Sequence, residues 1–188
     1  MRLLPDSRTS TPPSWREPKS GVRVSIDSLV QASLVDLFKA YGVAFAPMPR
    51  SAGVTPTAAE VSVAAAFRSG AGVAGRLTLS LPPALLEHMK GDEVTSLRLD
   101  WARELANQLL GRIKNRLLPF GVRVEIGLLT LLNPTLAQHQ RQDLSGQRVY
   151  FGRTLRGLVL VTLQGLPEDS ALSYVGAVGA TEGTMLWL

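Results

Sequence analysis

The sequence runs twice through the same order of predicted elements, a helix followed by short strands, and this order restricts the folds that the chain can adopt. The first half opens with the helical pattern IDSLVQASLVDLFKAYG after Ser25, and the second contains one long helical segment from Asp100 to Leu118. Two runs, EVSVAAAFR and GVAGRLTLSL, follow the first helix, and residues 69–72 between them predict a hairpin. Three runs, VRVEIGLLTLL, QRVYFGR and RGLVLVTLQG, follow the second helix.

These elements predict an α+β fold. Short neighbouring strands joined by tight loops favour an antiparallel sheet, with the amphipathic helices packed on one face. Each half also contains a strand that is entered through a glycine, Gly75 in the first and Gly157 in the second. We therefore expect an internal pseudo-repeat.

Local signals set the limits of the elements. Ser25 or Asp27 is suited to begin the first helix and Gly42 to end it, while Pro119 and Gly121 end the long helix. A short helix is predicted from the two prolines at 82–83 to about Lys90, and a polar loop is predicted over residues 133–146.

The chain divides into one domain and two extensions. Residues 1–22 contain four prolines among Ser, Thr and charged residues, and this composition predicts a flexible leader. Residues 23–166 form the predicted domain. Residues 167–188 are rich in small residues, and we expect them to add a final strand, MLWL, or to cover a sheet edge.

Composition excludes several classes of site. The 188 residues include no cysteine, so there are no disulfides or thiolate metal sites, and only two histidines, His88 and His139, for catalysis or metal binding. No window offers about 18 uninterrupted apolar residues. We expect a soluble, cytoplasmic protein that binds no cofactor or metal ion of its own.

The net charge of +5 raises the alternative of nucleic-acid binding. Many basic residues lie in or beside the leader, and the others are scattered without an aromatic-rich RNA-binding pattern or a zinc-finger pattern. A solvated basic surface explains them more simply.

The glycines Gly70, Gly72 and Gly75 resemble a phosphate loop, but no Gly-Lys-Ser/Thr follows, and a hairpin turn explains them better.

The long helix from Asp100 to Leu118 is amphipathic. At about 100° per residue, its apolar residues fall on one arc and its polar residues on the other. The apolar arc consists of Ala102, Leu105, Ala106, Leu109, Leu110, Ile113 and Leu117, and the polar arc of Asp100, Glu104, Asn107, Gln108, Gly111, Lys114 and Asn115.

Glu104 and Asn107 stand three residues apart on the polar arc, so a carboxylate and an amide can reach one partner molecule together. Alone, this spacing is a weak signal. A solvated helix face, with Glu104 in an ion pair with a neighbour such as Arg103, would produce the same pattern.

The motif and its setting resemble the CheC/CheX/FliY chemotaxis phosphatases, and within them the CheX-like branch. Glu104, Asn107 and Gly111 match the Glu-x-x-Asn helix of that family with its following glycine. The first helix, the hairpin that ends in GVAGRLTLSL and the strand after the long helix fall where the family has them, over about residues 23–166. The first helix offers Asp36 with Lys39 instead of a second motif, so the chain looks like a protomer with one site.

Three features depart from the family pattern. Arg103 stands where many relatives have glycine, Leu110 stands where they have a small residue, and the strand after the helix lacks a proline before Pro134.

The resemblance implies a protein-aspartyl-phosphate phosphatase that acts on a CheY-type response regulator. The receiver would supply the phospho-aspartate, a bound Mg²⁺ and a lysine. Glu104 would dock to that lysine and Asn107 would position the attacking water. Asp100, Gln108 and Gly111 would contact the partner, and pairing of sheet edges would give a homodimer.

Two alternatives remain open. The departures at Arg103 and Leu110 are compatible with a non-catalytic CheX-like module that binds a receiver or anchors a signalling complex. A basic scaffold that touches nucleic acid would instead show a contiguous Lys/Arg face and binding that weakens with salt.

Overall fold

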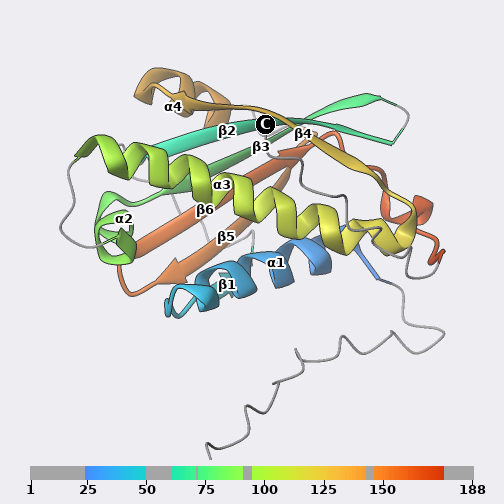
Figure 1. Cartoon of the computed structure of the whole chain (residues 1–188), viewed down its shortest axis with the longest axis horizontal. Helices are drawn as coiled ribbons and strands as arrows, with labels where there is room; N and C mark the ends of the chain where they lie inside the picture. Colours follow the sequence, from blue (N-terminus) through green and yellow to red (C-terminus); the bar gives the residue numbers. More distant parts are fainter. Residues whose placement is uncertain (1–23, 50–60, 71, 91–94, 143–145, 176–188) are drawn as a thin grey trace, which may run out of the picture.

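The computed structural model describes residues 24–49, 61–70, 72–90, 95–142 and 146–175. Its elements follow one another as shown in Figure 1. They are α1 (Ile26–Ala40), β1 (Ala46–Met48), β2 (Val61–Ser69), β3 (Val73–Leu81), α2 (Pro83–Lys90), α3 (Thr95–Leu117), the 3₁₀ turn η1 (Leu118–Phe120), β4 (Val124–Leu132), α4 (Pro134–Gln142), β5 (Arg148–Thr154), β6 (Gly157–Gln164) and the 3₁₀ turn η2 (Asp169–Ala171).

The six strands form one sheet in the order β1-β5-β6-β3-β2-β4, and all neighbouring strands are antiparallel. Exchanging β1, β2 and β3 for β4, β5 and β6 gives the same order read from the other end. Leu79 and Val161, which lie four residues after Gly75 and Gly157 respectively, are direct cross-strand partners in the centre of the sheet. The predicted pseudo-repeat is therefore present, with its twofold axis passing between these two residues.

Helices α1 and α3 lie side by side in front of the sheet (Figure 1) and pack against each other. The seven residues predicted for the apolar arc of α3 are all fully buried. They meet the inward-facing residues of the central strands, such as Val63, Leu79 and Val161, in a single core. The α+β prediction, with an antiparallel sheet and the two amphipathic helices on one face, is confirmed.

The predicted helix boundaries have clear local causes. The side chain of Ser25 accepts a hydrogen bond from the Ser28 N–H at 3.1 Å and so caps the start of α1. Gly42 follows that helix with φ of +69°, and Gly121 ends the turn after α3 with φ of +72°. Both angles lie in the left-handed region that glycine enters without a steric penalty.

Two short elements differ from the sequence prediction. The stretch 133–146, predicted as a polar loop, contains α4, because Asn133 Oδ1 accepts the Leu136 N–H at 2.7 Å and Pro134 occupies the first helical position. The three-residue strand β1, where the sequence analysis predicts no element, pairs with β5.

The predicted leader and the predicted strand MLWL lie outside the described residues. The start of the C-terminal extension packs against the domain: Asp169 Oδ1 accepts the Ile26 N–H at 3.1 Å, and the Val175 N–H donates to the Pro119 carbonyl at 2.9 Å. None of the described helices is long and apolar enough to cross a membrane.

Candidate active site on helix α3

Glu104 and Asn107 both lie on the exposed side of α3. Residues three apart on a helix have Cβ atoms about 5–6 Å from each other, so the two side chains project from one patch. Within the part of the chain that the structure describes, the Asn107 amide makes no hydrogen bond. Its donor and acceptor atoms are therefore available to a partner molecule.

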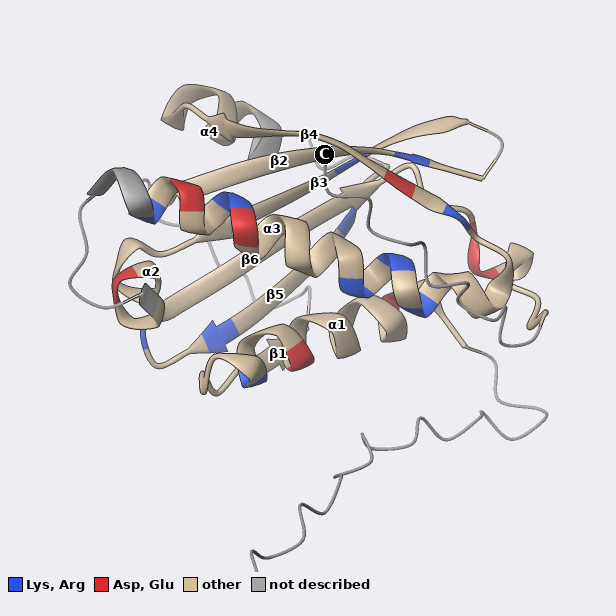
Figure 2. Ribbon diagram, in the orientation of Figure 1, with Lys and Arg blue, Asp and Glu red and all other residues tan. Residues whose placement is uncertain are grey.

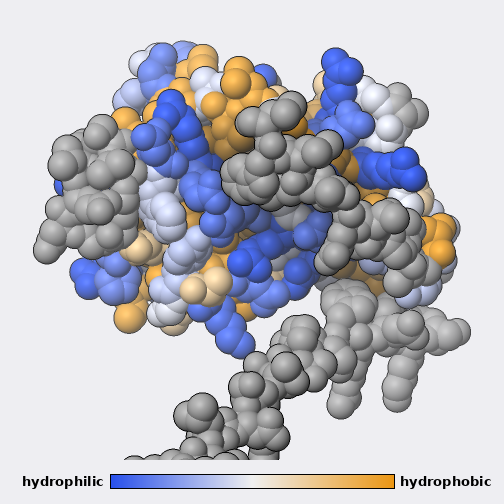
Figure 3. Space-filling model, viewed as in Figure 1, coloured by the Kyte–Doolittle hydropathy of each residue, from blue (hydrophilic) through white to orange (hydrophobic). Residues whose placement is uncertain are grey.

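Charge is distributed unevenly along this helix. Basic and acidic residues alternate over its N-terminal half, whereas only basic residues appear in its C-terminal half (Figure 2). Residues 105–111 between them carry no charge, and Asn107 lies in this neutral stretch. The middle of the same molecular face is hydrophilic (Figure 3).

Gln108 links Glu104 to the first helix. Its Nε2 donates to Glu104 Oε1 at 2.8 Å, and its Oε1 accepts from the Tyr41 hydroxyl at 2.8 Å. Tyr41 is the C-cap residue of α1, and its ring packs edge-on against Trp101 of α3 with centroids 5.3 Å apart. The Glu104 carboxylate is thus held through contacts that begin at the end of α1.

The neighbouring charged residues leave Glu104 without an ion pair among the described residues. Arg103 Nη1 instead contacts Asp100 Oδ1 at 2.6 Å, and both side chains are partly exposed. Sequence reasoning suggested Arg103 as a neighbour that could neutralise Glu104, and the structure assigns it to Asp100.

Gly111 and Leu110 differ in burial, because Gly111 is half-buried and Leu110 lies in the core. Apart from its chain neighbours and the backbone of α3 itself, a Cβ added at Gly111 would have no heavy atom of the described residues within 4 Å, so this position leaves open space beside Asn107. Leu110 is fully buried. This residue, at which the sequence departs from the pattern of the family it resembles, therefore lies outside the exposed patch.

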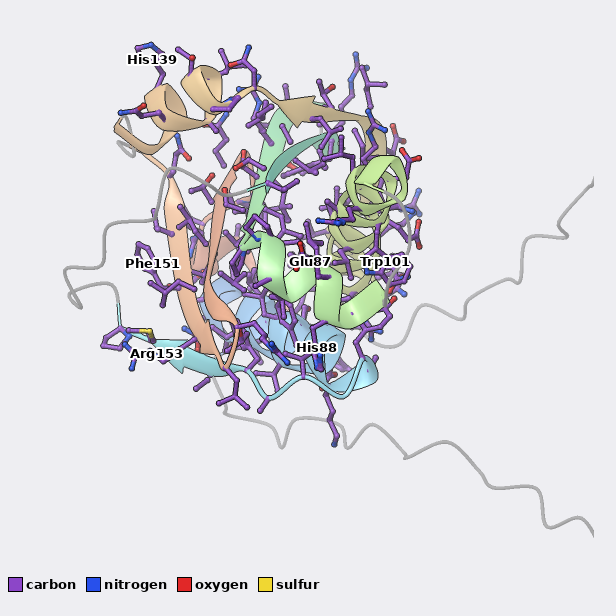
Figure 4. The ribbon with its side chains drawn as sticks, turned by 90° about the vertical axis from the view of Figure 1, so that its left-hand side faces the viewer. Glu87, His88, Trp101, His139, Phe151 and Arg153 are labelled. Carbon is purple, nitrogen blue, oxygen red and sulfur yellow. The ribbon has the colours of Figure 1, made fainter. Side chains whose placement is uncertain are left out.

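Helix α2 borders the N-terminal part of α3 (Figure 4), where Arg98 Nη1 contacts Glu87 Oε1 at 2.6 Å. The same view places His88 and His139 at opposite ends of the molecule, so the two histidines do not converge on one site. No group of three metal-ligating side chains occurs among the described residues.

Gly70 and Gly72 lie in the turn between β2 and β3 with positive φ, which confirms the hairpin reading of that glycine cluster.

Sequence reasoning missed a charged cluster at the start of α1. Arg148 lies 2.9 Å from Asp27 and 3.3 Å from Asp169, and the Tyr150 hydroxyl donates to Asp27 at 2.8 Å. The cluster borders a polar hollow of about 490 Å³. Its members come from segments more than a hundred residues apart, and only Asp27, in the first turn of a helix, carried a sequence signal.

The cluster shifts two pKa values. Burial and the hydrogen bond to Asp27 raise the pKa of Tyr150 well above its ordinary value. Burial acts to lower the pKa of Arg148, but the hydrogen bond with Asp27 and the nearby carboxylates outweigh it and raise that pKa. These charges are satisfied by one another, so the cluster joins α1, β5 and η2.

Solved structures share the architecture that holds this site. Chemotaxis protein CheX from Vibrio vulnificus is 15% identical, with a TM-score of 0.58, over 77% of this chain and 99% of that one. A CheC-like superfamily protein from Shewanella sp. PV-4 is 15% identical, with a TM-score of 0.57, over 73% of this chain and 95% of that one. CheX from Desulfovibrio desulfuricans is 12% identical, with a TM-score of 0.55, over 73% and 97%.

The chain has the fold of the CheX and CheC-like chemotaxis proteins. No family model and no curated protein sequence matches it. The match spans 95–99% of each of these three structures.

Proposed function

We propose that this chain is a phosphatase of phospho-aspartate in a CheY-type receiver, with Asn107 as the catalytic residue and Glu104 as the docking residue. The observation that carries the proposal is the exposed pair on α3 of a CheX-like fold. Among the described residues, the Asn107 amide in its uncharged stretch has no hydrogen-bond partner, and no cation neutralises the carboxylate of Glu104.

The proposed reaction is hydrolysis of an acyl phosphate. The oxygen of a water molecule attacks phosphorus, the bond between phosphorus and the aspartyl oxygen breaks, and aspartate and inorganic phosphate are released. By the family resemblance, the receiver brings the phosphoryl group and the metal ion that offsets its charge. This chain has to supply the position of the water.

An amide is suited to that task. Its carbonyl accepts a hydrogen bond from the water while its NH₂ group donates to a phosphoryl oxygen, and neither contact adds charge beside the phosphoryl group. The neutral stretch 105–111 around Asn107 favours the approach of an anionic group more than an acidic stretch would.

Glu104 has a different role in the proposal. Its carboxylate pairs with the lysine of the receiver and sets the register in which the two proteins dock. Loss of Glu104 should therefore raise KM for the phosphorylated receiver, whereas loss of Asn107 should lower kcat.

The test is phosphate release from a phosphorylated receiver of the same organism. Positioning of a water by one side chain contributes about 10²–10⁴ in rate, so Asn107→Ala should lower kcat by that factor with little change in receiver affinity. Asn115→Ala is the matched control, because Asn115 is also exposed on α3 but lies about two turns further along. Equal rates for wild type and Asn107→Ala would overturn the catalytic role and leave the receiver-binding module.

A further inference from the structure

Tyr41 lies at a junction between the two long helices. It follows the last residue of α1 as the C-cap, and its ring contacts Trp101 edge-on, with an interplanar angle of 81°. Its hydroxyl reaches along α3 to donate to Gln108 Oε1 at 2.8 Å. Trp101 and Gln108 are two turns apart on one side of α3, so Tyr41 bridges the stretch of helix that contains Glu104.

The two neighbours of Gln108 fix the direction of its amide. A carboxylate can only accept hydrogen bonds, so the Glu104 side must receive the NH₂ group, and the carbonyl oxygen then faces the hydroxyl of Tyr41. The reversed amide would place two oxygens against each other at Glu104. Both contacts are 2.8 Å long and agree with this direction.

In this arrangement Gln108 occupies one of the two oxygens of the Glu104 carboxylate. Only Oε1 accepts from Gln108, and Oε2 makes no hydrogen bond with any of the described residues. A long charged side chain on an exposed helix otherwise samples several rotamers, and it must lose that freedom when it docks. The hydrogen bond to Gln108 removes much of it before the partner arrives.

We propose that Tyr41 and Gln108 are positioning residues, which hold Glu104 in place through one oxygen and present the other to the receiver lysine. The proposal rests on the proposed function. The addition is that docking depends on the contact between the C-terminal end of α1 and the interior of α3, at Trp101 and Gln108. We call the two hydrogen bonds from Tyr41 through Gln108 to Glu104 the relay. Trp101 supports it because it packs against the ring of Tyr41.

The test is Tyr41→Phe, which keeps the ring against Trp101 and removes only the hydroxyl. Immobilising one flexible side chain corresponds to about 2- to 12-fold in affinity, so KM for the phosphorylated receiver should rise by that factor while kcat stays nearly constant. Tyr174→Phe is the matched control, because the Tyr174 ring packs on Phe120 and its hydroxyl makes no hydrogen bond to the described residues.

A double-mutant cycle separates positioning from a purely structural role. In a Glu104→Ala background, Tyr41→Phe should have no further effect on KM, because nothing remains to be positioned. An equal rise in KM in both backgrounds would overturn the relay and assign Tyr41 to helix packing alone.

A second readout does not depend on phosphatase activity. The side-chain NH₂ resonances of Gln108 should shift and exchange faster with solvent in Tyr41→Phe and in Glu104→Ala. Unchanged resonances in both variants would overturn the relay even if the proposed function stands. Changed resonances in a protein that releases no phosphate would support the relay and refute the phosphatase.

Discussion

Arg116 of α3 forms an ion pair with Asp36 of α1, with 2.6 Å between Nη2 and Oδ2. On the first helix, Asp36 with Lys39 stands where a second Glu-x-x-Asn motif would be sought. Its pairing with Arg116 ties the two long helices together and occupies the group that a second docking site would need. That the protomer carries a single site stays a prediction.

This ion pair yields the first prediction. Asp36→Asn should leave phosphate release within about twofold of wild type and should lower the free energy of unfolding by no more than about 1 kcal/mol, because a partly exposed pair contributes little. Parallel assays of activity and denaturant unfolding check both values. A rise in KM comparable with that of Glu104→Ala would show that α1 also docks the receiver.

Asn107→Asp tests why the catalytic position holds an amide. The substitution keeps the size of the side chain but adds a negative charge and removes the donor, so we expect kcat to fall by about 10²–10⁴. Thermal unfolding should be unchanged, because the residue is exposed. Asn115→Asp provides the matched control on the same helix, and full turnover by Asn107→Asp would contradict the assigned role.

Gly111→Ala separates stability from docking. A glycine inside a helix costs about 0.5–1 kcal/mol relative to alanine, and the added Cβ meets no atom within 4 Å, so the variant should be more stable by that amount. If loops of the receiver use this space, KM should rise at the same time. Greater stability with an unchanged KM would place Gly111 outside the contact.

Tyr150 gives a prediction on pH. Its pKa is raised in the folded protein, so the unfolded chain ionises first, near pH 10, and the stability that Tyr150 contributes is present below about pH 10 and is lost as the pH rises further. Tyr150→Phe should flatten this alkaline loss. It should also lower stability at neutral pH by about 0.5–1.5 kcal/mol, since the hydrogen bond to Asp27 is removed.

Unfolding by denaturant below and above about pH 10 measures both effects. The matched control is Tyr174→Phe, because Tyr174 lies on the surface. An equally steep alkaline loss in wild type and Tyr150→Phe would contradict the account of the cluster around Asp27.

The sequence predicted those elements that are long enough for the spacing of their apolar residues to repeat. Residues of α3 such as Leu105, Leu109 and Ile113 recur at helical spacing, and this spacing identified the buried arc and the exposed pair together. Helix α4 was missed although Asn133 and Pro134 carry a recognised start signal, because its polar residues obscured the pattern. Strand β1 has only three residues, and Pro47 lies within it.

The contacts that organise the site could not be predicted in this way. Tyr41 and Gln108 are 67 residues apart, and their hydrogen bond depends on how α1 and α3 lie across the sheet. The same holds for Arg148 and Asp27, which are 121 residues apart. Periodicity identifies which face of an element is buried, but the neighbour that this face meets is set by the sheet order.

The measurement that tests the central claim most directly is phosphate release from a large excess of phosphorylated receiver over this chain, with Asn107→Ala in parallel. A phosphatase turns over many receivers per molecule, and Asn107→Ala should abolish that excess release while it still binds the receiver. Release that never exceeds the spontaneous decay of the receiver, or that is the same for both proteins, would contradict the account.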